Sequence, residues 1–147
     1  MSFSRRPARA PIIWIYAVSV IANYVAQVPY TIHLYGTAFS RSGALLLGAT
    51  LLWFIVALRL FLNRRRLGYW LLLAYAITQA LFYVNGELVL AFAGYGLPYH
   101  LSHTADLIVW LAFVVGDLNF IAAIAVVVYL LRRRGALLRP ETDAAPD

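Results

Sequence analysis

Long stretches without a charged residue are the feature that most limits what this chain can fold into. The 31 residues between Arg9 and Arg41 include no Asp, Glu, Lys or Arg, and the 20 residues between Arg66 and Glu87 include none either. About 20 apolar residues are enough for a helix to cross a hydrocarbon core roughly 30 Å thick. Charged residues make up 12% of the chain, against about 25% in soluble domains. This composition disfavours a soluble enzyme, a disordered protein and a nucleic-acid-binding domain.

We therefore predict an all-α integral membrane protein that folds as a four-transmembrane-helix bundle. The transmembrane domain is expected to cover residues 1–134, with helices at approximately 12–34, 43–62, 67–93 and 106–131. Residues 135–147 are rich in Pro and acidic residues, and we expect them to form a short disordered cytoplasmic tail.

The end of the third helix has two interpretations. Asn85-Gly86 is a turn signal, so the helix ends there and residues 88–94 lie along the membrane interface, or the helix continues to about Ala93. We favour the longer helix, because Glu87 then falls on the same face as other polar residues of that segment.

Clusters of arginine flank three of the predicted helix ends. They are Arg5, Arg6 and Arg9 before the first helix, Arg64, Arg65 and Arg66 between the second and third, and Arg132, Arg133 and Arg134 after the fourth. The other two loops contain only one basic residue between them, Arg41. Cytoplasmic loops of membrane proteins carry an excess of basic residues, so both termini are predicted to be cytoplasmic. We expect a multi-pass plasma-membrane protein of bacterial type, because the use of Arg without any Lys is typical of GC-rich coding.

Polar and aromatic residues recur at helical spacing within three of the predicted spans: the first, the third, and the fourth, where Trp110 and Phe113 lie between Asp106 and Asp117. Residues three or four positions apart share a helix face. The first helix carries Tyr16, Ser19, Asn23, Gln27 and Tyr30 in this way, and the third carries Tyr75, Gln79, Tyr83 and Glu87. These stripes predict a polar interior surrounded by an apolar exterior, with a cavity that opens to the outer side and narrows towards Asp117.

Asp117 is the residue that stands out most, because a charge at the bilayer centre costs about 2.5–3.5 kcal/mol on insertion scales. It is expected to face the interior of the bundle and to hydrogen-bond Asn23 or Gln79. Its carboxyl group then either relays a proton or cation, anchors the polar head of a ligand, or forms a hydrogen bond that holds two helices together. Asn119 lies about 200° further round the helix and is expected to bond a neighbouring helix or a second protomer.

The candidate residues for ligand binding or proton relay are Asp117, Glu87, Asn23, Gln27, Gln79 and Tyr83. A metal site is a weaker candidate: it would use His100, His103 and Asp106, with Glu87 and His33 at similar depth. Helix capping explains the same segment, since Ser102 or Thr104 can cap the fourth helix and Asp106 then complements its dipole. A haem held between His33 and His100 or His103 is a still weaker candidate. We predict no metal and no cofactor.

Catalytic signatures are missing from the sequence. It contains none of the common hydrolase, metalloprotease or nucleotide-binding motifs, and no Cys. Residues 24–31, YVAQVPYT, are similar to helix segments of the four-helix sterol-isomerase and sigma-2-receptor-like group. The resemblance covers one helix and lacks the Glu-plus-Pro pattern sought in the second helix, so it implies no site residues here.

Three functions remain compatible with these features. The first, which we favour, is a non-enzymatic membrane protein that binds an apolar ligand or a partner subunit in its interior. The second is a small proton- or cation-coupled transporter. The third is a membrane-embedded lipid or isoprenoid enzyme that uses Glu87 and Asp117 as acid and base. The expected partners are the lipid bilayer and further copies or subunits of a membrane complex, with no nucleic acid.

Overall fold

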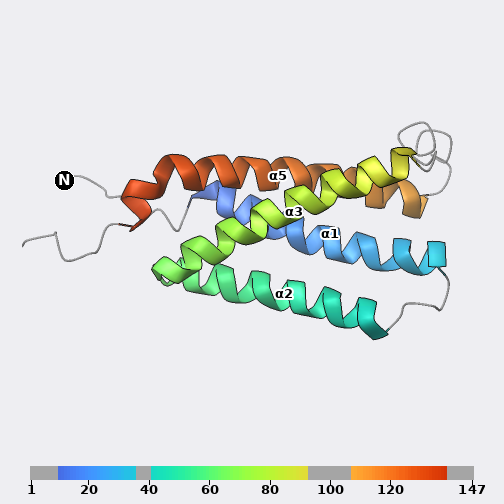
Figure 1. Cartoon of the computed structure of the whole chain (residues 1–147), viewed down its shortest axis with the longest axis horizontal. Helices are drawn as coiled ribbons and strands as arrows, with labels where there is room; N and C mark the ends of the chain where they lie inside the picture. The colour runs from blue at the N-terminus through green and yellow to red at the C-terminus, as the bar shows by residue number, and fades with distance from the viewer. Residues whose placement is uncertain (1–9, 36–40, 93–106, 139–147) are drawn as a thin grey trace, which may run out of the picture.

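Four long helices make up the part of the chain that the structure describes. A computed structural model describes residues 10–35, 41–92 and 107–138 of the chain. The helices are α1 (Pro11–Tyr35), α2 (Arg41–Leu62), α3 (Arg66–Phe92) and α5 (Leu107–Leu138), and they run roughly along one long axis (Figure 1). Each contains a segment long and apolar enough to cross a membrane. The prediction of an all-helical protein with four helices of spanning length is therefore confirmed.

Helix α3 continues through Asn85 and Gly86 to Phe92, as in the longer of the two interpretations. A glycine inside a helix costs about 1 kcal/mol relative to alanine. The residues that follow Gly86 are Glu, Leu, Val, Leu, Ala and Phe, and they include several good helix formers. The Asn-Gly pair alone therefore does not stop the helix.

Helix α5 is longer than predicted at its C-terminal end. The helix passes the three arginines and ends at Leu138, so the prediction of disorder from residue 135 is wrong for residues 135–138. Ala136 and the two leucines after it favour a helix, and Leu137 and Leu138 pack against the hydrophobic core. The predicted disorder of residues 139–147 falls outside the described residues.

The helices pack in the spatial order α1, α5, α3, α2. Helix α5 contacts both α1 and α3, and α3 also contacts α2, whereas α1 and α2 contact each other little. Figure 1 shows α1 next to α5, and α3 running obliquely across the bundle from the end of α2. The arrangement is a bundle with one open seam, between α1 and α2.

The hydrophobic core lies towards the end of the bundle that carries the arginines. It joins the first half of α1 to the last part of α2, the first half of α3 and the last half of α5. Its largest fully buried side chains are Tyr16, Tyr69, Tyr75, Phe54, Ile13, Leu72 and Leu130. Many large apolar side chains also lie on the outside, Ile15 at 62% and Ile121 at 62% exposure among them. An apolar exterior of this extent matches helices that face hydrocarbon rather than water.

The turn between α2 and α3 is short and closely packed. The amide N–H of Arg65 donates to the carbonyl of Leu60 at 2.9 Å, and that of Arg64 donates to the carbonyl of Phe61 at 2.9 Å. These two bonds form a Schellman motif, which requires a left-handed residue after the helix. Arg64 is that residue, with φ of 56°. The motif reverses the chain so that α3 starts directly beside the end of α2.

Candidate functional site

The central contact of the candidate site joins Asp117 of α5 to Tyr83 of α3. The hydroxyl of Tyr83 donates a hydrogen bond to Oδ1 of Asp117. The ring of Tyr83 also stacks on Phe120, with ring centroids 4.8 Å apart and planes inclined by 19°. Because Phe120 follows Asp117 by three residues, both lie on one face of α5. The stacking therefore holds the phenol in the position from which it reaches the carboxylate.

Gly116 lets side chains from two other helices approach this contact. A Cβ atom at Gly116 would lie 3.4 Å from Cε2 of Tyr83 and 3.9 Å from Nε2 of Gln27. The glycine is buried, and its missing side chain leaves the space that these two groups occupy. Gln27 of α1, Tyr83 of α3 and Asp117 of α5 thus meet at one place, which we call the Asp117 cluster.

The polar stripe of α1 faces α5 next to this cluster. The hydroxyl of Ser19 donates to Oδ1 of Asn119 at 3.1 Å and to the carbonyl of Tyr16 at 2.8 Å. Asn119 is buried and bonds a neighbouring helix, which was one of the two expectations for it. Asn23 lies between Ser19 and Gln27 at i+4 spacing, and its buried Oδ1 has no hydrogen-bond partner among the described residues. An unsatisfied buried acceptor of this kind costs about 1–3 kcal/mol, so this position favours a bound donor.

The partner of Asp117 differs from the sequence prediction. Asn23 or Gln79 was expected to bond it, but Tyr83 does so. A tyrosine side chain reaches further than an amide, and the stacking on Phe120 directs it to the carboxylate. Gln79 is half-buried one turn before Tyr83, on the same face of α3.

Several predicted residues fall where side chains are not described. Glu87 lies within helix α3 and His33 within α1, but only their backbone is described. The metal candidates His100, His103 and Asp106 lie outside the described residues. Among the residues that the structure does describe, no group of three metal-ligating side chains occurs.

A second polar network, which sequence reasoning missed, links α1, α2 and α3. The hydroxyl of Tyr24 donates to Oγ1 of Thr50 at 2.7 Å and lies 3.3 Å from the hydroxyl of Tyr75. Since Tyr24 uses its proton towards Thr50, Tyr75 is the donor in the second bond. Thr50 in turn donates to the carbonyls of Leu46 and Leu47, each at 3.0 Å. Thr50 is one of the few polar residues of the apolar helix α2, and the need of its hydroxyl for a partner is the sequence signal of this network.

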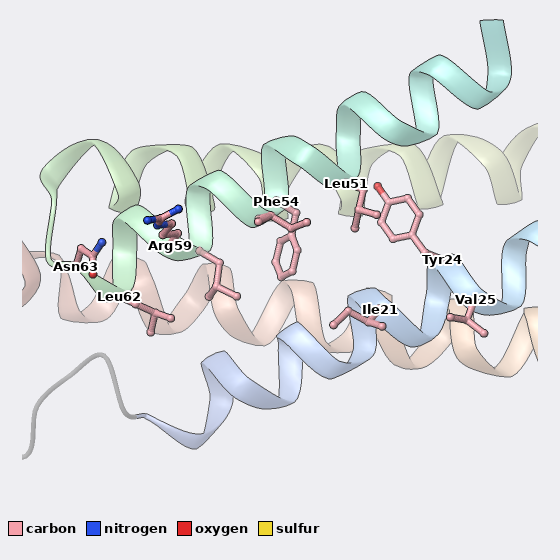
Figure 2. A pocket seen from close by; sticks show the side chains of 10 residues that line it. Ile21, Tyr24, Val25, Leu51, Phe54, Arg59, Leu62 and Asn63 are labelled. Atoms are coloured by element: carbon pink, nitrogen blue, oxygen red, sulfur yellow. The ribbon is translucent and has the colours of Figure 1, made fainter. Parts of the chain in front are cut away.

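A cavity of about 670 Å³ lies between α1 and α2 (Figure 2). Most of its lining is apolar, and the polar side chains in the lining are Tyr24, Arg59 and Asn63. Its volume falls within the range of about 300–1,000 Å³ that is typical of small-molecule sites. None of the six predicted ligand or relay residues lines it. The cavity predicted to narrow towards Asp117 therefore stays a prediction.

Comparisons with protein families, with curated proteins and with solved structures find no match to this chain. We therefore infer the function from the chemistry of the chain's own residues. At the Asp117 cluster, the described residues supply one hydrogen bond to the carboxylate, at Oδ1. The remaining acceptor capacity of that group suits a hydroxyl, an ammonium group or a proton.

Proposed function

We propose that this chain is an integral plasma-membrane protein with four spans and cytoplasmic termini, and that it binds an apolar ligand or a partner subunit through the Asp117 cluster. The observation that carries this proposal is the meeting of Gln27, Tyr83 and Asp117 from three different helices. Polar groups that converge inside an otherwise apolar bundle are the usual construction of a site for an apolar molecule with a polar head.

The membrane part of the proposal is supported by the distribution of charge and apolar surface. All four helices are of spanning length and composition, and large apolar side chains cover their outer faces. The arginines of the second and third clusters lie at one end of the bundle, where α2 gives way to α3 and where α5 ends. The positive-inside rule assigns that end to the cytoplasm.

The depth of the cluster follows from helix geometry. Asp117 precedes Arg132 by roughly 22 Å along α5 and follows Leu107 by roughly 15 Å, at 1.5 Å per residue. The carboxylate is therefore deep within a hydrocarbon core about 30 Å thick, in the half away from the arginines. Carboxylates at such depth pair with another polar group or mark a functional site, and we propose that a donor group of the ligand completes the pairing that Tyr83 begins.

The ligand that fits these groups has an apolar body and a head that donates hydrogen bonds. The carboxylate of Asp117 accepts such bonds, and the amide of Gln27 both donates and accepts. The buried oxygen of Asn23, one turn along α1 from Gln27, accepts a further donor. A hydroxyl or ammonium head on a hydrocarbon body meets these requirements, and so does a polar residue on a partner's transmembrane helix.

Native mass spectrometry of the protein released in mild detergent tests the proposal. The wild-type protein is expected to retain a small molecule or a second subunit, and Asp117→Asn and Tyr83→Phe are both expected to lose it. Tyr24→Phe is the matched control, because it removes the same hydroxyl from the other polar network. A bound species that survives in Asp117→Asn, or a wild-type protein that carries nothing, contradicts the proposal and leaves Asp117 as an interhelical bond.

One observation also favours the second candidate function, a proton- or cation-coupled transporter. The hydrogen bond between Tyr83 and Asp117 joins two titratable groups within a membrane span, as proton relays do. Flux of protons or cations into reconstituted vesicles, lost in Asp117→Asn, is the expected result. Vesicles without flux, or with flux that Asp117→Asn leaves unchanged, contradict the transporter hypothesis.

A further inference from the structure

The seam between α1 and α2 is open along part of its length. Helix α1 packs mainly on α5 and α2 mainly on α3, so α1 and α2 cover only part of each other's sides, as where Tyr16 meets Phe54. The cavity of about 670 Å³ occupies this seam, and the apolar side chains along it remain accessible. Ile21, Val25 and Ile55, which line it, are 56%, 67% and 51% exposed. In a membrane, this groove faces lipid.

The two ends of the groove differ in chemistry. Near one end, the hydroxyl of Tyr24 bonds Thr50 and ties α1 to α2. At the other end lie Arg59 and Asn63, close to the turn that leads into α3 (Figure 2). The groove is thus apolar along its length and polar where it approaches the arginine end of the bundle.

The dimensions of the groove fit acyl chains rather than a helix. From Leu51 to Asn63 it extends roughly 18 Å along α2, slightly more than one leaflet of a hydrocarbon core about 30 Å thick. Divided by this length, the cavity volume corresponds to a cross-section of about 37 Å². A helix with its side chains is at least about 10 Å wide and needs roughly 80 Å². The groove is therefore too narrow to enclose a helix of a second copy, whereas hydrocarbon chains fit within it.

The positive charge at the polar end of the groove favours a lipid with an anionic headgroup. Arg59, Arg64, Arg65 and Arg66 lie within eight consecutive residues that contain no acidic residue. The guanidinium group of arginine binds phosphate through two parallel hydrogen bonds. Each basic residue near a membrane surface contributes about 1 kcal/mol to the attraction of anionic lipid. The phosphate of an anionic lipid complements the positive charge of this end.

We propose that the groove between α1 and α2 binds one anionic phospholipid from the leaflet at the arginine end. Its acyl chains lie along Ile21, Val25 and Ile55, and its phosphate binds Arg59. The inference rests on the membrane insertion proposed above, but it is independent of any ligand at the Asp117 cluster.

Lipid retention by the purified full chain tests this inference. The protein in mild detergent is mixed with equal amounts of phosphatidylglycerol and phosphatidylcholine of the same chain lengths, and bound lipid is counted by native mass spectrometry. The wild-type protein is expected to retain one phosphatidylglycerol in preference to phosphatidylcholine. Arg59→Gln is expected to weaken that preference about fivefold. Arg132→Gln, which removes an exposed arginine of α5 outside the groove, is expected to leave it unchanged.

A second pair of variants tests the groove itself. Ile55→Trp fills the space between the helices and is expected to abolish retention of both lipids. Leu52→Trp places the same bulk on an exposed site of α2 outside the lining and is expected to retain phosphatidylglycerol. Circular dichroism shows which variants fold. If Ile55→Trp does not fold, the lipid preference of Arg59→Gln tests whether the groove binds phosphatidylglycerol.

Several results overturn the inference. In the first, the wild-type protein retains the two lipids equally. In the second, Arg59→Gln and Arg132→Gln weaken the preference for phosphatidylglycerol equally. In the third, the wild-type protein is a dimer that Ile55→Trp disrupts. The outcome is also separable from the proposed function, because Asp117→Asn is expected to leave phosphatidylglycerol retention intact while it releases the ligand of the Asp117 cluster.

Discussion

Substitution of Gly68 by alanine is the sharpest test of how α2 and α3 pack. Gly68 is the third residue of α3 and is buried against the end of α2. A Cβ atom at this position would lie 2.7 Å from Cα of Phe61, and closer still to the backbone nitrogen of Phe61 and the carbonyl carbon of Leu60. All three atoms belong to the backbone of α2, so no side-chain rotation relieves the overlap.

The magnitude follows from this geometry. Carbon atoms in good contact are about 3.5–4.0 Å apart, so α3 must move away from α2 by about 1 Å. Overpacking of a buried site typically costs about 1–3 kcal/mol, and a backbone clash belongs at the upper end. Alanine returns up to about 1 kcal/mol through its higher helix propensity. We expect Gly68→Ala to lower the free energy of unfolding by about 2 kcal/mol or more.

The assay is unfolding by a denaturing detergent, followed by circular dichroism, with Gly48→Ala as the matched control. Gly48 lies in α2, and a Cβ atom there would meet nothing within 4 Å. The same substitution is therefore expected to raise stability at residue 48 by up to about 1 kcal/mol. If Gly68→Ala is as stable as the wild type, or if both variants lose stability equally, the close approach of α3 to α2 at this turn is refuted.

Three further substitutions have expected effects that the same titration measures. Leu130→Ala removes a fully buried side chain and should lower the free energy of unfolding by about 2–5 kcal/mol, whereas Leu131→Ala, at an exposed site, should change it little. Tyr24→Phe loses both hydrogen bonds of its hydroxyl and should cost about 1 kcal/mol, in the range of other interhelical bonds in membranes. Arg64→Gly removes the steric cost of a left-handed backbone at a residue with a side chain and should raise the free energy of unfolding by about 1 kcal/mol. A lower free energy of unfolding in this variant would contradict the Schellman motif.

The helices were predictable from sequence because their signal is local. A run of uncharged residues about 20 long identifies a spanning segment whatever the rest of the chain does. The prediction for the end of α5 was wrong because a contact between residues far apart in the sequence determines where the helix ends. The Pro and acidic residues of the segment 135–147 suggested a disordered tail, but the packing of Leu137 and Leu138 on the core extends the helix into its first residues.

The site was predictable only in part. Helical spacing correctly placed Ser19 and Gln27 on one face of α1, because spacing determines which residues share a face. It does not determine which helix that face meets, so the contact with Asn119 and the approach to Gly116 required the structure. Depth estimates of 1.5 Å per residue ignore helix crossing, which is why Asn23 and Gln79 were expected as partners of Asp117 and Tyr83 was not.

The uneven distribution of polar residues explains why one seam of the bundle is open. Between helices in hydrocarbon, apolar faces gain little from packing on each other instead of on lipid, and polar bonds and small residues decide which faces join. Helix α5 has Gly116, Asp117 and Asn119 to join α1 and α3. Helix α2 offers α1 a single bond, at Thr50, among the described residues. The rings of Tyr16 and Phe54 also meet across the seam, with centroids 5.9 Å apart, and the groove opens beside these contacts. The scarcity of polar bonds between α1 and α2 thus leaves room for a lipid whose headgroup would reach Arg59.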